Sequence, residues 1–134
     1  MDDAPKGPAR TFDVQLRAES SCMVANVTGW IETVDALIAL FVQIGAAVRD
    51  RHCTRLLVLD HTRGVVPPEH EMKRLMAAMD GRGFAKVRIA YVDMRGTAVS
   101  RMEVGEILGR ERGYDCRVFD NEQRGRIWLN YGDD

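Results

Sequence analysis

Two stretches near the start of the chain have the hydrophobic pattern of β-strands. Residues 12–18 alternate between apolar and polar side chains, which is the period of a half-buried strand. A mostly apolar run at 22–27 follows a short polar turn, and Thr28-Gly29 is predicted to end it. The short link favours an antiparallel hairpin, whose first strand is expected at an edge of the sheet.

The clearest helix is predicted to begin after Thr33. Thr33 is a candidate N-cap, and Asp35 lies in the first turn, where the helix dipole favours a negative charge. Apolar residues recur three and four positions apart and define one face of this helix. They are Val34, Leu37, Ile38, Phe41, Gly45 and Val48.

The next apolar run, from Leu56 to Leu59, is continuous, which is typical of a central strand covered on both faces. Residues 61–68 are predicted to form a loop, in which Pro67 and Pro68 precede a second helix. Its apolar stripe either packs in the core or offers an adaptable surface to a partner. The stripe consists of Met72, Leu75, Met76 and Met79, and Gly81 and Gly83 follow it.

Strand and helix patterns alternate in the rest of the chain. They predict a strand at 87–93, a helix at about 98–112 with Val104, Ile107 and Leu108 directed inward, a strand at 116–119, and a final helix with Ile127, Trp128 and Leu129. The order β-β-α-β-α-β-α-β-α predicts one α/β domain at 12–130 with a mixed, mostly parallel sheet. A flexible tail is expected at 1–11.

The composition argues against several classes of protein. The chain has 134 residues, of which 46% are hydrophobic and 29% charged, the balance of one globular domain. Its net charge of −1 lacks the basic excess of nucleic-acid binders, so no nucleic-acid partner is expected. The polar N-terminus does not resemble a signal peptide, and the longest apolar stretch, 34–48, is too short and too polar for a membrane span. A cytoplasmic location is therefore expected.

The sequence predicts neither a disulfide nor a metal or cofactor site. Cys22, Cys53 and Cys116 are odd in number, widely spaced and without a CxxC motif, so we expect reduced core residues. The three histidines lack metal-ligand spacing. The glycines near 81–83 follow a predicted helix and lack the rest of a dinucleotide-binding motif.

Polar residues after two neighbouring strands form the candidate functional site, because ligands of open α/β sheets bind beyond the carboxyl ends of strands. The residues are Asp60, His61, Thr62, Arg63 and Gly64 in the first loop, and Asp93 and Arg95 in the second. Two interpretations stay open. The loop either binds a partner or accepts a phosphate on Thr62, or it is a solvated turn in which Asp60 and Thr62 bond nearby backbone groups.

Catalysis by this loop is not favoured. Asp60 and His61 are adjacent, so on an extended segment their side chains point in opposite directions and cannot form an acid–base pair. No GxSxG motif is present. No catalytic residue is assigned.

Three stretches carry a family resemblance: the strand–turn–helix at 24–40, the strand and loop from Leu56 to Gly64, and the segment from Arg112 to Asp120, closing with Ile127-Trp128-Leu129. On these, residues 12–129 resemble the STAS superfamily, the fold of bacterial anti-sigma-factor antagonists, and more narrowly its SpoIIAA-like branch. The resemblance implies a non-enzymatic regulatory domain that binds an unidentified protein partner, as a monomer or a homodimer. In those antagonists a serine in an Asp-Ser-x-Gly-like motif is phosphorylated. This chain has no serine there, and Thr62 is the only hydroxyl within reach.

Two alternatives from other classes stay open. The first is a carrier of a small molecule or lipid, of the SEC14-like kind, with the apolar helix at 34–48 lining a pocket for a hydrophobic ligand. The second is an enzyme that uses Asp60, His61 and Arg63.

Overall fold

The predicted antiparallel hairpin opens the fold. The computed structural model describes residues 11–96 and 99–132, and the predicted tail at 1–10 lies outside them. β1 (Phe12–Ala18) pairs with β2 (Met23–Ile31) in antiparallel register. The prediction that β2 ends at Thr28-Gly29 was wrong. Gly29 stays in the strand because its missing side chain lets the backbone of Thr11 and Phe12 pass at close range, at a φ of +104°.

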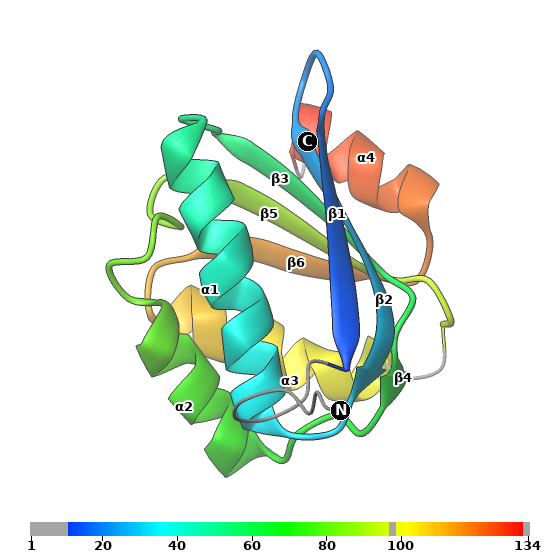
Figure 1. Cartoon of the computed structure of the whole chain (residues 1–134). Coiled ribbons are helices and arrows are strands. Elements are labelled where there is room, and N and C mark those ends of the chain that lie inside the picture. The colour runs from blue at the N-terminus through cyan, green and yellow to red at the C-terminus, as the bar shows by residue number, and fades with distance from the viewer. Residues whose placement is uncertain (1–10, 97–98, 133–134) are drawn as a thin grey trace, which may run out of the picture.

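The sheet is mixed, and its main strand order is β1-β2-β3-β5-β6. β1 lies at one edge, as predicted, and the strands from β2 to β6 along this order run parallel (Figure 1). These strands are β3 (Arg55–Asp60), β5 (Arg88–Asp93) and β6 (Asp115–Phe119). The short β4 (Arg63–Gly64) pairs in parallel with the end of β2. The expected loop at 61–68 therefore contains a strand, because β2 extends far enough to provide a partner for it.

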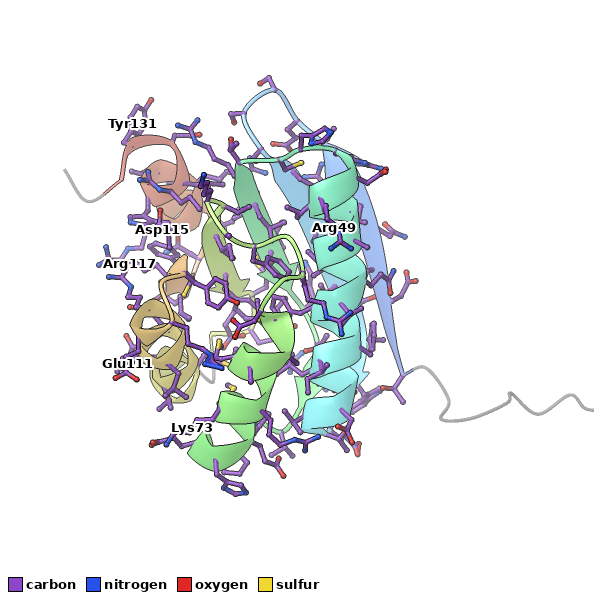
Figure 2. The ribbon with its side chains drawn as sticks, turned by 90° about the vertical axis from the view of Figure 1, so that its left-hand side faces the viewer. Arg49, Lys73, Glu111, Asp115, Arg117 and Tyr131 are labelled. Carbon is purple, nitrogen blue, oxygen red and sulfur yellow. The ribbon has the colours of Figure 1, made fainter. Side chains whose placement is uncertain are left out.

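Helices cover the sheet unequally on its two faces (Figure 1). One face carries α1 (Val34–Asp50), α2 (Glu69–Met79) and α3 (Val99–Glu111), which lie together in Figure 2. The other face carries α4 (Glu122–Tyr131). Leu56 and Val58 of β3 belong to the three-helix side of the core, and Leu57 and Leu59 to the α4 side. This confirms that the continuous apolar run is a strand covered on both faces.

The starts of two helices follow from local chemistry. The Thr33 hydroxyl accepts a hydrogen bond from the backbone N–H of Ala36 at 3.1 Å, so the predicted N-cap of α1 is confirmed. Pro68 occupies the position just before α2 rather than the first helical position. Its carbonyl accepts from Glu71 and Met72, and its ring does not interrupt the helix.

The predicted inward face of α3 is confirmed at Leu108, which packs against the core, but is wrong at Ile107. Gly105 and Gly109 are buried, whereas Ile107, expected to point inward, is 57% exposed. The two glycines lie one turn apart and let α3 approach the side chains of Met72 and Met76. Close packing of these two small residues therefore sets the orientation of α3, and this orientation leaves Ile107 exposed. The predicted start of this helix at residue 98 lies outside the described residues.

The remaining apolar predictions had mixed outcomes. On α4, Trp128 and Leu129 are buried against the sheet, but Ile127 is exposed. The three cysteines are free thiols, and each is half-buried rather than fully enclosed in the core. Across the described ranges, every helix is too short or too polar to cross a bilayer.

Candidate functional site

The sheet brings the two predicted loops together. Asp60 at the end of β3 and Asp93 at the end of β5 are register partners on adjacent parallel strands. Their side chains lie on the three-helix side, and with the β4 segment they line a cleft of about 300 Å³. Of the predicted site residues, Asp60, Thr62, Arg63, Gly64, Asp93 and Arg95 line this cleft, whereas His61 does not. Its apolar walls include Trp30, Ile31, Leu37, Val66 and Met102.

Asp60 is the centre of the polar network in the cleft. Its Oδ1 accepts hydrogen bonds from the backbone N–H of Thr62 at 2.7 Å and from the Thr62 hydroxyl at 2.6 Å. Its Oδ2 accepts from the hydroxyl of Tyr91. The local turn expected of a solvated loop is therefore present, and the same residues also line a cavity. The three donors hold the carboxylate in one orientation.

Tyr91 is a site residue that the sequence reasoning missed. The tyrosine lies within a strand and looked like one more apolar residue, although its parity with Asp93 places both on the same face. It is buried, and its ring stacks on Phe41 with 6.0 Å between centroids. Burial raises the pKa of Tyr91 well above its ordinary value, and the negative charge of Asp60, its hydrogen bond to Asp60 and the charge of Asp93 raise it further. The phenol therefore stays protonated and acts as a donor.

Asp93 lies deeper than Asp60. It is only 8% exposed, and its Oδ1 accepts a hydrogen bond from the backbone N–H of Arg95 at 3.1 Å. The side chains of Arg63 and Arg95 are at the exposed rim. The cleft therefore has carboxylates toward its floor and guanidinium groups at its mouth.

The rim on the β2–β4 side is formed by an aromatic–cation pair. The guanidinium of Arg63 lies 5.9 Å from the centre of the Trp30 ring. Trp30 is 51% exposed at the end of β2 that pairs with β4. Val65, next in the loop, is 62% exposed.

Gly64 fixes the position of this rim. Its φ is +133°, and a side chain there would overlap the carbonyl oxygen of Ile31. The pairing of β4 with β2 therefore requires glycine at this position. The backbone N–H of Val65 then donates to Ile31 at 3.2 Å and continues the contact.

His61 lies on the opposite side of the chain from Asp60. Its backbone N–H donates to Val27, and its Nε2 is 3.3 Å from Oδ1 of Asn26. Asn26 shares the α4 face of the sheet by its alternation with Val24. The alternation expected for an extended segment thus separates the imidazole from the cleft.

A second, smaller cavity adjoins the cleft between α2, α3 and the sheet. Its volume is about 70 Å³, and Met72, Met76, Met79 and Met102 are among its walls. Leu37, Tyr91 and Met102 line both cavities. The methionine stripe predicted for α2 therefore packs in the core and also bounds this space.

Cysteine and metal chemistry add little to the site. Burial raises the pKa of the Cys116 thiol to about 11, and burial likewise raises the pKa of Cys22. Both are therefore protonated and weakly nucleophilic at neutral pH. Within residues 11–96 and 99–132, histidine, cysteine and carboxylate side chains nowhere gather as a group of three that could hold a metal ion.

Comparison with known proteins does not place the chain in a family, since neither a family model nor a curated protein matches its sequence.

Proposed function

We propose that this chain is a non-enzymatic regulatory module that acts through protein–protein contacts, as its resemblance to SpoIIAA-like proteins of the STAS superfamily implies. The observation that carries the proposal is the exposed rim formed by Trp30, Arg63 and Val65. Tryptophan and arginine supply much of the binding energy at protein interfaces. A half-exposed tryptophan held against an arginine offers a large contact surface that needs little ordering on binding.

The polar network supports binding over catalysis. A general base must be oriented toward a reacting group, but the only imidazole in the loop, that of His61, lies away from Asp60. Asp60 itself is engaged by Thr62 and Tyr91. These contacts support a rigid binding surface.

Phosphorylation of Thr62 is not part of this proposal. The Thr62 hydroxyl already donates to Asp60, and Asp93 lines the same cleft. A phosphate on Thr62 would add about two negative charges beside two carboxylates, and among the described cleft residues the positive charges are those of the exposed Arg63 and Arg95.

Affinity capture from the host lysate tests the proposed partner surface. We expect the wild-type protein to retain a specific partner and the Trp30→Ala variant to lose at least about tenfold in affinity, as hot-spot residues do. Tyr131→Ala is the matched control, because Tyr131 is an aromatic residue that is 73% exposed at the far end of α4. Equal capture by wild-type protein and Trp30→Ala would remove this rim as the contact surface.

The second candidate function is binding of a small molecule, and the two adjoining cavities favour it. Native mass spectrometry of protein purified from its own host tests this candidate. A bound small molecule that is displaced when the protein is denatured supports it. A spectrum that contains only the bare chain contradicts it.

A further inference from the structure

The two edge strands of the sheet differ in how their outer backbone groups are satisfied. At the β6 edge, side chains of α3 bond to these groups. Nε of Arg110 donates to the carbonyl oxygen of Cys116 at 3.0 Å. Oε1 of Glu106 accepts from the backbone N–H of Val118 at 2.7 Å. Because both contacts occupy positions that a further strand would use, the β6 edge is protected against strand addition.

The centre of β1, at the other edge, has no such contacts within the part of the chain that the structure describes. The carbonyl oxygen of Thr11 accepts from the backbone N–H of Trp30, so the backbone groups of Thr11 face β2. In an antiparallel pair, residues that face the partner strand alternate with residues that face away from it. The N–H and C=O groups of Val14 and Leu16 therefore face outward, where a further strand could pair with them.

The side chains along the β1 edge are accessible. Asp13, Gln15 and Arg17 are exposed on one face of the strand. Val14 and Leu16 are half-buried on the other face, where they pack against the three-helix side of the core. Figure 2 shows β1, in blue, at the margin of the molecule beyond α1. The edge therefore offers a polar row, an apolar row and outward backbone groups to one partner.

The sequence of β1 is complementary to itself. When two copies of the strand are placed antiparallel about a two-fold axis at Gln15, Asp13 of each copy lies opposite Arg17 of the other. Val14 then lies opposite Leu16, and their outward backbone groups form the hydrogen-bonded pairs. The charged residues fall at the non-hydrogen-bonded positions, where side chains approach most closely. A shift by two residues in either direction would take Asp13 out of register with Arg17.

We propose that β1 is the interface of a homodimer, in which β1 of a second copy pairs antiparallel about Gln15 and makes the two sheets continuous. The interface uses none of the rim residues Trp30, Arg63 and Val65, so it goes beyond the proposed partner surface and does not depend on it. The pairing is isologous, with the same residues on both copies. Because the β6 edge is protected, further copies do not extend the sheet, and the assembly closes as a dimer.

The existing contacts of Arg17 allow this pairing. Nη2 of Arg17 lies 3.0 Å from Oε2 of Glu19, and the Arg17 side chain is 51% exposed. Glu19 also pairs with Arg126 at 2.8 Å. When Arg17 turns toward Asp13 of a second copy, Glu19 therefore keeps a cationic partner.

Sedimentation velocity of the full chain, at concentrations from about 1 μM to about 1 mM, tests the proposal. We expect a monomer–dimer equilibrium. Asp13→Arg and Arg17→Asp should each weaken the dimer about tenfold, because like charges then face each other at two symmetric positions. The combined Asp13→Arg/Arg17→Asp variant should recover dimerisation, because opposite charges face each other again. Glu111→Arg is the matched control, because it makes the same change of charge at an exposed position on the opposite side of the molecule (Figure 2).

Three results of this experiment would overturn the proposal. The first is a chain that stays monomeric up to about 1 mM. The second is a dimer that all of the β1 variants leave unchanged, since it would use another surface. The third is a combined variant that dimerises no better than the single variants, since the charged residues would then not face each other.

Cysteine cross-linking tests the register directly. Residue 15 lies on the two-fold axis, so its two copies would be about 4.5 Å apart between Cα atoms, within the range of a disulfide. Gln15→Cys should therefore form a linked dimer under mild oxidation. Asp13→Cys should not, because position 13 faces Arg17 of the other copy, and the wild type controls for the three half-buried native cysteines. Equal yields from Gln15→Cys and Asp13→Cys, at concentrations at which both are dimeric, would contradict the register.

Discussion

The two faces of the sheet differ in the side chains that fill the space between the sheet and its helices. On the α4 face, Trp128 and Leu129 press on the aliphatic residues of β3 and β5, and Gly125 lies so close to Val92 that a Cβ would come within 2.9 Å of its Cγ2. On the three-helix face, methionines border a small cavity between α2, α3 and the sheet, and the larger cleft lies at the carboxyl ends of the strands. The buried centre of the α4 face is closely packed, and the three-helix face contains the adaptable side chains and the candidate site.

This difference shows how a small sheet separates stability from function. Closely interlocked side chains lose contacts that cannot be recovered when one of them is removed. Methionine-lined space tolerates change because the side chains rearrange. We therefore expect substitutions on the α4 face to affect folding most, and substitutions near the cleft to affect binding most.

The largest expected effect contrasts Trp128→Ala with Met76→Ala. Trp128 is buried, contacts Phe119 at 5.8 Å between ring centroids, and lies beneath the guanidinium of Arg88. Its removal should lower the free energy of unfolding by about 3–5 kcal/mol. Met76→Ala should lower it by about 1 kcal/mol, because this side chain is half-buried and its neighbours can adjust. Urea denaturation measures the free energy of unfolding of both variants. Equal losses in the two variants would contradict the difference in packing between the two faces.

Gly64→Ala should have the next largest effect. The substitution forces a side chain into the carbonyl of Ile31 at a φ of +133°, so β4 must separate from β2. We expect a loss of about 2–3 kcal/mol in the free energy of unfolding and a change in Trp30 fluorescence. Gly96→Ala is the matched control, because Gly96 has a φ of +70°, but among the described residues beyond its chain neighbours no atom lies within 4 Å of its Cβ position. A loss in Gly64→Ala no larger than in Gly96→Ala would show that β4 is not held by this close contact.

Tyr91→Phe should have a moderate effect that depends on pH. It removes a buried donor from the Asp60 carboxylate, and we expect a loss of about 1–2 kcal/mol in the free energy of unfolding at pH 7. Because the folded pKa of Tyr91 is raised, the stabilisation linked to its proton is complete below the ordinary tyrosine pKa of about 10. It is lost as the pH rises through the folded pKa.

Unfolding free energies measured from pH 7 to pH 11 test this expectation. The decline at alkaline pH should be smaller in Tyr91→Phe than in the wild type. Tyr114→Phe is the control at a partly buried position, where the pKa of the tyrosine is raised to about 12 chiefly by burial and then by the hydrogen bond to Asp80. If the two variants lose equal stability at pH 7, burial of the Tyr91–Asp60 pair contributes nothing extra.

The smallest expected effect concerns the ion pair that joins the hairpin to α4. Nη1 of Arg126 lies 2.8 Å from Oε1 of Glu19, and this hydrogen bond lowers the pKa of Glu19. Both side chains are partly exposed, so Glu19→Gln should cost only about 0.2–1 kcal/mol at pH 7 and low salt. The lowered pKa makes this contribution complete above the unfolded value of about 4.3 and lost as the pH falls below it. A difference between variant and wild type that persists at pH 3 or in high salt would contradict an electrostatic origin.

Local patterns predicted most of the elements of this fold. The alternation at 12–18, the cap at Thr33 and the continuous apolar run of β3 all correspond to observed structure. These features depend on residues within a few positions of one another, so a sequence can reveal them directly. The exposed Ile107 could not be predicted in this way, because the packing of Gly105 against methionines of another helix selected the face of α3.

The candidate site was predictable in part. A polar loop after a central parallel strand indicated where to look, and six of its proposed residues line one cleft. Tyr91 could not be found by the same reasoning, because its role depends on a hydroxyl that reaches Asp60 from a neighbouring strand.

The amino-acid sequence by itself determined the order of the main elements and the double coverage of the central strand, because these follow from periodicity. Tertiary structure alone decided that Asp60 lies beside Asp93, that Tyr91 holds Asp60, and that His61 faces away from both. Those contacts join residues about 30 positions apart and depend on strand register, and register results from the packing of the whole sheet.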